Sequence, residues 1–149
     1  MEHINGIKAT VVGVLGCLTA LWGWFGWLVL AWVACMAVDY VSGSSAAMRA
    51  GQWSSAKARS GIWHKAGMIV VVLVAALADA VLGTVAAKVP GLSIEYTVLL
   101  LPMVLVWYIL TELGSILENA AAMGAPVPAF LIRILANAKD TVEDAAGEG

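Results

Sequence analysis

A long stretch without charge constrains this chain more than any other feature. Residues 9–38, between Lys8 and Asp39, contain no Asp, Glu, Lys or Arg. Across all 149 residues, 62% are hydrophobic and 12% are charged, about half the charged share of an ordinary soluble domain. A soluble domain of this size cannot hide so much apolar surface. The composition therefore predicts a protein whose solvent is the lipid bilayer.

The uncharged stretch is too long for one upright helix. At 1.5 Å per residue it would reach about 45 Å, against about 30 Å for a hydrocarbon core. Gly23 and Gly26, within the sequence WGWFGW, allow a turn, and tryptophans settle at the headgroup level. We expect two segments, at about 7–22 and 25–43. A single tilted helix with a wide aromatic face is the alternative.

Small residues form a stripe along the first segment. They are spaced three and four residues apart, which places them on one helix face. Small side chains let helix backbones approach closely in lipid. We therefore expect this face to pack against a helix of the same chain or of a neighbouring subunit. The stripe consists of Gly6, Ala9, Gly13, Gly16, Ala20 and Gly23.

Two further apolar segments follow. One covers about 66–87, with Asp79 as its single charge. The other covers about 94–118, and Pro102 predicts a kink that neighbouring helices in lipid can accommodate. Together with the first two segments, they predict an all-α integral membrane protein with three to four transmembrane helices in residues 1–120.

Basic residues gather in the connection at 44–65. Loops rich in Lys and Arg stay in the cytoplasm, so we expect this loop and the tail after Glu118 to be cytoplasmic. The N-terminus is also inside if the segment at 7–22 spans the bilayer, and outside if that segment lies along the surface. The connection has no acidic residue, and its basic residues are Arg49, Lys57, Arg59 and Lys65.

Three carboxylates need an explanation. Asp79 falls near the middle of its expected span, where an ionised carboxylate costs about 3 kcal/mol. Its helical neighbours include Ala76 and Gly83, so we expect it at a helix–helix contact. There it either lines a water path in an assembly or hydrogen-bonds across a packed interface. Asp39 and Glu112 fall at expected span ends, where water or the basic loop would satisfy them.

The sequence offers no pattern for chemistry. It contains no P-loop, no G-x-S-x-G, no dinucleotide fingerprint and no His/Cys/Asp/Glu spacing typical of a metal site. We expect no enzyme activity, catalytic residue, cofactor or metal. The net charge of −2 also gives no reason to expect a nucleic-acid partner.

The C-terminal region, 121–149, predicts a cytoplasmic amphipathic helix with an acidic tail. Such a helix lies on the membrane or pairs with neighbouring tails, and its acidic end favours protein contacts over anionic lipid. Its apolar residues recur at helical spacing: Val127, Phe130, Leu131, Ile134, Leu135, Ala138 and Val142.

Two patterns in the chain resemble a known family. The first is DYVSG followed by a lysine before the next span, and the second is ELGSILEN followed by GAPVP. Over about Val38 to Leu135 the sequence resembles the phage-lysis and toxin-release holins (phage holin family 4), which include clostridial toxin-secretion holins. The tryptophan-rich N-terminal part departs from that pattern. The residues that carry the resemblance are Asp39, Tyr40, Gly43, Lys65, Glu112, Glu118, Asn119, Pro126 and Pro128.

The resemblance implies a function. Holins oligomerise in the cytoplasmic (inner) membrane of a bacterium and permeabilise it, so that a cytoplasmic endolysin or toxin escapes and the host cell lyses. The implied partners are the lipid bilayer, further copies of the chain and that endolysin or toxin. On this reading Asp79 becomes hydrated when the assembly opens. The alternatives are an antiholin and a small multispan channel or transporter subunit.

Overall fold

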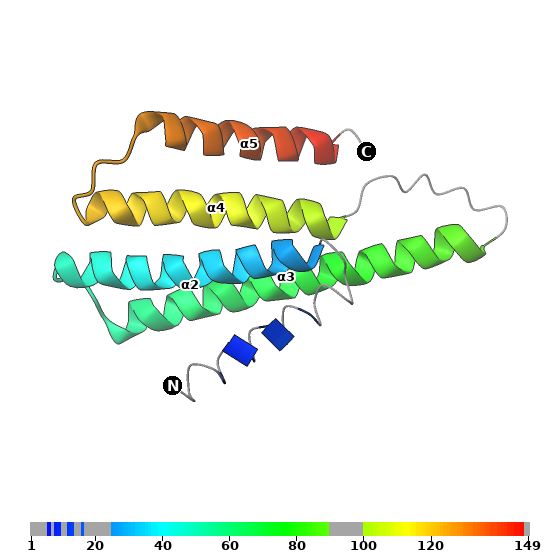
Figure 1. Ribbon diagram of the computed structural model, residues 1–149, viewed down its shortest axis with the longest axis horizontal. Coiled ribbons are helices and arrows are strands. Elements are labelled where there is room, and N and C mark those ends of the chain that lie inside the picture. The colour runs from blue at the N-terminus through cyan, green and yellow to red at the C-terminus, as the bar shows by residue number, and fades with distance from the viewer. Residues whose placement is uncertain are drawn as a thin grey trace.

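The described part of the chain consists of helices and the short connections between them. No strand occurs among the residues that the computed structural model describes, which are 25–89, 100–147 and the separate residues Gly6, Lys8, Ala9, Val12, Gly13 and Gly16. In chain order, the long helices are α2 Phe25–Arg49, α3 Ser55–Lys88, α4 Leu100–Ala122 and α5 Ala129–Gly147 (Figure 1).

Three of these helices, α2, α3 and α4, are long and apolar enough to cross a membrane. Their 25, 34 and 23 residues correspond to about 38, 51 and 35 Å of helix, and each exceeds a hydrocarbon core of about 30 Å. The prediction of an all-α membrane protein is thereby confirmed. Most of the segment expected at 7–22 lies outside the described residues.

The expected loop at 44–65 is wrong, because most of it is helical. α2 continues to Arg49 and α3 already begins at Ser55, so only residues 50–54 connect them. The Ser54 hydroxyl accepts the backbone N–H of Lys57 at 3.2 Å, which caps α3. Lys and Arg are good helix formers, so the basic residues extend both helices, and Gly51 makes the turn with a φ of +65°.

α4 also differs from the segment expected at 94–118. It begins at Leu100, and residues 94–99 lie outside the described part of the chain. Pro102 therefore falls in the first turn of the helix, where its missing N–H removes no helical hydrogen bond. The position explains why a proline is tolerated in this helix, and the kink expected in the segment at 94–118 stays a prediction.

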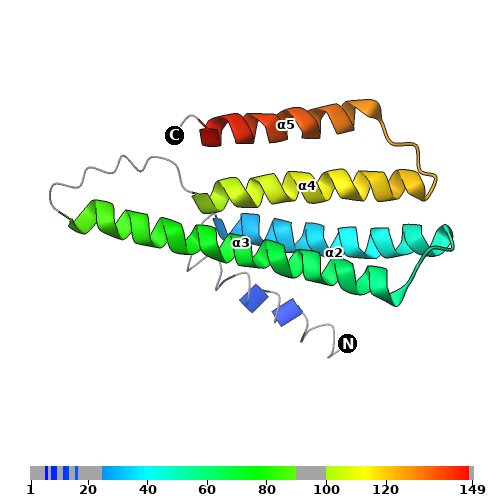
Figure 2. The same ribbon diagram turned by 180° about the vertical axis from the view of Figure 1, so that it is seen from behind.

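α2, α3 and α4 pack around one apolar core. α3 crosses the other two helices at an angle, and its C-terminal end extends past the start of α4 (Figure 2). Leu105 is fully buried in the core, and the Trp32 ring stacks on Tyr108 with centroids 6.0 Å apart. The buried core residues are Trp32, Met36, Met68, Val72, Ala75, Leu101 and Leu105.

The outer face of α3 is apolar and exposed. Val70, Leu73 and Leu77 are 59%, 57% and 65% exposed. A soluble protein seldom leaves so continuous an apolar surface in water. This surface therefore suits lipid, or a neighbouring chain within lipid.

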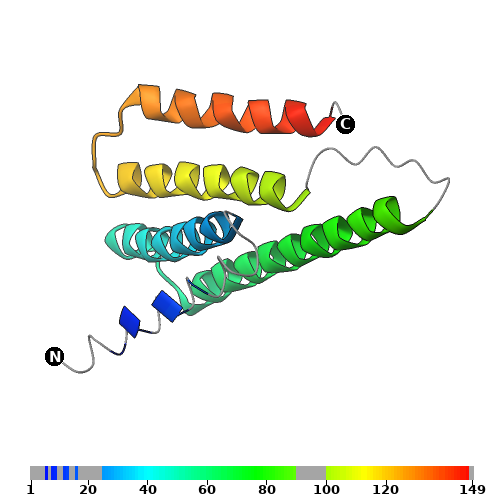
Figure 3. The ribbon, with the colours of Figure 1, turned by 45° about the vertical axis from the view of Figure 1, so that its right-hand side comes forward.

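α5 turns back along α4 and packs against it (Figure 3). The connection contains Gly124, whose φ is +93°, a value that favours glycine after a helix end. Pro126 and Pro128 follow, so the helix break expected from these residues is present. The predicted amphipathic helix thus forms, and its partner among the described residues is α4 of the same chain.

Candidate functional site: a polar cluster shared by three spans

One ammonium group joins all three candidate spans. Lys65 on α3 places its Nζ 2.9 Å from Asp39 Oδ2 on α2. The same Nζ lies 2.9 Å from Glu112 Oε1 and 2.7 Å from Glu112 Oε2 on α4. The ion pairs of this one lysine therefore hold α2, α3 and α4 together at a level where the chain does not connect them.

An amide extends the network toward the end of the bundle. Asn119 Nδ2 donates to Asp39 Oδ1 and to Ser42 Oγ, both at 3.0 Å, and Ser42 Oγ donates to the Asp39 carbonyl at 3.1 Å. Helical periodicity explains the grouping, since residues three, four or seven apart share a helix face. We call Asp39, Ser42, Lys65, Glu112 and Asn119 the polar cluster.

Gly43 makes room for this network. A Cβ atom built at Gly43 would lie 3.3 Å from Asn119 Nδ2 and 3.6 Å from its Oδ1. That separation is closer than an ordinary van der Waals contact, so a side chain at position 43 would push the amide away. The glycine of the DYVSG sequence thus allows the close approach of α4 to α2.

The polar cluster is sheltered and carries an uneven charge. The side chains of Lys65, Asp39 and Glu112 are 15%, 18% and 4% exposed. Two carboxylates share one ammonium, so the three groups sum to one excess negative charge when all are ionised. Charges in such surroundings persist only when they are paired. We expected either water or the basic loop to satisfy Asp39 and Glu112. The structure shows that Lys65 does so.

Asp79 contacts the start of the neighbouring helix α4. Its Oδ1 accepts the N–H of Leu100 and its Oδ2 accepts that of Leu101, each at 2.8 Å. A carboxylate at a helix start satisfies free N–H groups and complements the helix dipole. Because α3 begins at Ser55, Asp79 lies late in α3 and level with the start of α4, where it hydrogen-bonds across a helix–helix contact. Its depth in a bilayer stays a prediction.

The small residues around Asp79 pack on only one side. Ala75 is buried and Ala76 packs against the core, whereas a Cβ atom built at Gly83 would meet nothing within 4 Å. The polar cluster lies at the other end of the bundle, because Asp79 follows Lys65 by about 21 Å of helix. Within the described ranges, the spans thus share two separate polar contacts.

Two further family residues, Tyr40 and Glu118, lie on α2 and α4. The Tyr40 ring is 3.8 Å from a Cβ atom built at Gly61, and Glu118 is exposed at the end of α4.

In the N-terminal stripe, Cβ atoms built at Gly13 and Gly16 would meet nothing within 4 Å. Ala9 is exposed, and Ala20 and Gly23 lie outside the described residues. The packing role of that stripe, which includes Gly6, stays a prediction.

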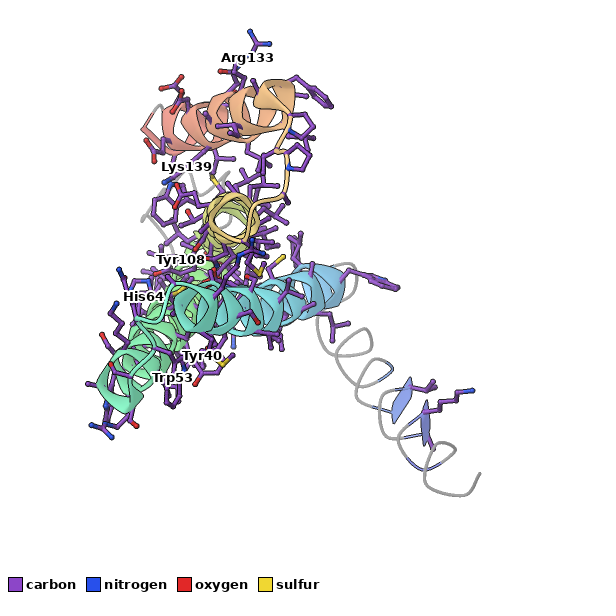
Figure 4. All side chains as sticks on the ribbon, turned by 90° about the vertical axis from the view of Figure 1, so that its left-hand side faces the viewer. Tyr40, Trp53, His64, Tyr108, Arg133 and Lys139 are labelled. Carbon is purple, nitrogen blue, oxygen red and sulfur yellow. The ribbon has the colours of Figure 1, made fainter. Side chains whose placement is uncertain are left out.

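A cavity of about 250 Å³ lies beside the polar cluster. Figure 4 looks at this end of the bundle, where the labelled Tyr40, Trp53 and His64 side chains gather around α2 and α3. Asp39, Lys65 and Asn119 also line the cavity. Sequence reasoning missed the cavity, and it did not identify Lys65 as the shared partner of the two carboxylates. The signal that could have revealed them is the spacing of Glu112, Ser115 and Asn119, which places three polar residues on one face of an apolar helix.

A second set of missed contacts holds α5 to α4. Trp107 Nε1 donates to Glu143 Oε1 at 2.7 Å, and Lys139 Nζ lies 4.1 Å from the centre of the Trp107 ring. Figure 4 shows Lys139 between α5 and α4, with Arg133 on the opposite side of α5. No amphipathic pattern within α5 alone identifies this tryptophan as its partner.

The arrangement joins helices. Among the described residues, no three His, Cys, Asp or Glu side chains gather as a metal site. In the polar cluster both carboxylates already form ion pairs with the lysine, inside a bundle whose outer face is apolar. Its chemical capacity is to hold three spans together and to present a polar surface when they separate.

Comparison with known proteins places the chain in a family. An uncharacterized protein of Halalkalibacterium halodurans is 32% identical over 122 residues, which cover 82% of this chain and 85% of that protein. An uncharacterized protein of Listeria innocua is 30% identical over 129 residues, covering 87% and 84%. No solved structure matches. The model of the bacteriophage holin family matches residues 16–140, which include the whole polar cluster and Asp79. The chain therefore belongs to the bacteriophage holin family.

Proposed function

We propose that this protein is a holin that oligomerises in the bacterial cytoplasmic membrane and permeabilises it. The opening would release a cytoplasmic endolysin, or a toxin, and lead to lysis of the host cell. The family match over residues 16–140 carries the proposal. Three apolar candidate spans and the exposed apolar face of α3 support it, since lateral assembly needs a surface available within lipid.

The polar cluster gives the proposal a physical basis. A closed bundle keeps the carboxylates of Asp39 and Glu112 away from lipid by turning them onto Lys65. A water-filled opening needs polar groups on its wall, because lipid-facing side chains cannot hydrate it. Separation of α3 from α2 and α4 would turn these charged groups toward water. In this proposal the same residues stabilise the closed bundle and line the opening.

The orientation follows from charge. The end of the bundle with Arg49, Lys57 and Arg59 is proposed to face the cytoplasm, by the rule that basic connections stay inside. The connection after α3 then lies outside and the C-terminus is cytoplasmic. The N-terminal stripe and Gly83 are proposed as contacts between copies of the chain.

The position of α5 against α4 sets a condition on this topology. α5 carries Arg133, Lys139, Asp140, Glu143 and Asp144, and the helix lies alongside a candidate span. At the centre of a bilayer each such residue costs about 2.5–3.5 kcal/mol on insertion scales. We therefore propose that α5 leaves α4 in the membrane, turning at Gly124 and the two prolines, and lies at the cytoplasmic surface.

The test is induced expression in a bacterium, with and without an endolysin that lacks an export signal. Turbidity and membrane potential are recorded together. A holin produces a delayed, abrupt loss of potential, and the culture clears only when the endolysin is present. Continued growth with an intact potential would contradict the proposal and favour an antiholin. A conductance that requires a ligand, without killing, would favour a channel subunit.

A further inference from the structure

The cavity beside the polar cluster has its charges arranged by depth. Asp39 and Lys65, which line it, are only 18% and 15% exposed. Lys57 and His64, which also line it, are exposed. The inner wall is therefore formed by the Asp39–Lys65 pair of the polar cluster, and the outer rim carries basic side chains. Glu112, which gives the cluster its excess negative charge, contacts Lys65 but does not line the cavity.

The basic groups of the rim are available for a ligand. Within the part of the chain that the structure describes, the ion pairs formed by lysine involve Lys65 alone. Neither Lys57 nor His64 has a carboxylate partner in those residues. By contrast, Asp39 accepts from Lys65 on one oxygen and from Asn119 on the other, with Ser115 as a further partner, and a carboxylate can accept about four hydrogen bonds. The cavity thus offers donors at its mouth and acceptor capacity within.

The cavity opens at the level where lipid headgroups lie. Trp53 and Trp63 are 49% and 75% exposed at this end of α3, and exposed tryptophans of membrane proteins settle at the interface. The cavity is also small. Its volume of about 250 Å³ is below the roughly 300–1,000 Å³ of pockets that enclose a whole drug-sized ligand. A group that enters it while the rest of the molecule stays in the bilayer fits this size.

We propose that the cavity binds the phosphoethanolamine headgroup of a membrane phospholipid. The phosphate lies at the rim against Lys57 and His64, and the ammonium enters toward Asp39. The second ammonium offsets the excess negative charge, so two carboxylates then face two cations. The acyl chains stay outside, along the apolar surface of α3. A zwitterionic headgroup matches both charges of the cavity, whereas an anionic headgroup matches the rim alone.

Binding is measurable without any lytic activity, so the outcome is independent of the proposed holin function. The purified full chain in a mild detergent is titrated with phosphatidylethanolamine, phosphatidylglycerol and phosphatidylcholine of matched acyl chains, and bound lipid is counted by native mass spectrometry. We expect one phosphatidylethanolamine per chain, bound about ten-fold more tightly than either other lipid. Equal or tighter binding of phosphatidylglycerol would overturn the proposal in favour of simple attraction to a basic surface.

Variants locate the site. Lys57→Gln combined with His64→Gln should weaken phosphatidylethanolamine binding about ten-fold. Arg59→Gln, which removes a charge from the same turn of α3 but does not line the cavity, should leave it unchanged. Ala47→Leu fills the cavity without altering charge and should also weaken binding. Equal losses in the Lys57 and Arg59 variants, or no loss with Ala47→Leu, would overturn the assignment.

A last arm separates the lipid from a soluble source of the same group. Free phosphoethanolamine is added as a competitor at increasing concentration. Weak competition, at concentrations at least about a hundred-fold above those of the lipid, is expected because the acyl chains contribute much of the binding. Displacement at equal concentration would assign the cavity to the soluble compound and overturn the lipid proposal. Helical circular dichroism of every variant checks that the bundle is intact.

Discussion

Lys65 and Glu112 lie 47 positions apart in the sequence, and yet the lysine Nζ reaches both carboxylate oxygens of Glu112, at 2.9 and 2.7 Å. Because Asp39 shares the same ammonium, Lys65→Met leaves two sheltered carboxylates without a cation. Removing one partner of a buried ion pair costs about 3–5 kcal/mol. We expect a loss of that size in the free energy of unfolding, measured by denaturant titration in detergent. Lys57→Met, at an exposed lysine of the same helix, should change it by less than about 0.5 kcal/mol.

Glu112→Gln should be milder than Lys65→Met. The glutamine oxygen still accepts from Lys65, and the change removes the excess negative charge of the cluster. We expect a loss of about 1 kcal/mol or less in the same unfolding experiment. A Glu112→Gln variant as unstable as Lys65→Met would mean that both carboxylates are needed as charges, against the uneven pairing described above.

Gly43→Ala tests the close approach of α4 to α2. The new methyl group would lie 3.3 Å from Asn119 Nδ2 and displace its hydrogen bonds to Asp39 and Ser42, at a cost of about 1–3 kcal/mol. Gly114→Ala is the matched control, because a Cβ atom there meets nothing within 4 Å. It should be neutral or stabilise α4 by up to about 1 kcal/mol. Equal effects of the two alanines would contradict the contact.

Asp79→Ala removes the acceptors of the Leu100 and Leu101 N–H groups. The loss of a helix cap typically costs about 0.5–2 kcal/mol, and here it should act locally. Hydrogen exchange should accelerate at the start of α4 and stay unchanged near Asn119. Asp79→Asn keeps one acceptor oxygen and should give a smaller change. If the proposed holin function holds, both variants should shift the time of lysis; unchanged timing would remove Asp79 from the opening step.

The release of α5 in the membrane is tested with a variant free of native cysteines. Glu143→Cys should react with an impermeant maleimide in inverted membrane vesicles and resist it in intact cells. Leu110→Cys in α4 should resist the reagent on both sides. Protection of position 143 on both sides would show that α5 stays on Trp107, and reaction from outside would reverse the proposed orientation.

The spans were predictable because lipid imposes a length and an apolar composition that can be counted along the sequence. Their ends were less so. The Ser54 hydroxyl caps α3 by accepting one hydrogen bond, and the basic residues after it continue the helix. Hydropathy treats those residues as a loop, because it measures transfer to lipid and carries no term for helix propensity or capping.

The polar cluster was only half predictable. The sequence patterns singled out Asp39, Lys65, Glu112 and Asn119, but the partner of each depends on the register between helices that meet in space. The same applies to Asp79, whose carboxylate is satisfied by the N-terminus of a helix that begins 21 positions later. Backbone N–H groups at a helix start have no signature in composition or periodicity.

The order of the three charged residues along the chain has a consequence for biosynthesis. Asp39 emerges from the ribosome before Lys65, and Lys65 before Glu112. The hairpin of α2 and α3 can therefore enter the bilayer with Asp39 matched to Lys65, while Asp79 awaits the N–H groups of α4. Glu112 is synthesised later, on α4, and its carboxylate must pair with Lys65, which is already paired with Asp39. Insertion of α4 is thus the step at which the nascent protein takes up its surplus charge, and a chain stopped after α3 would contain a balanced pair.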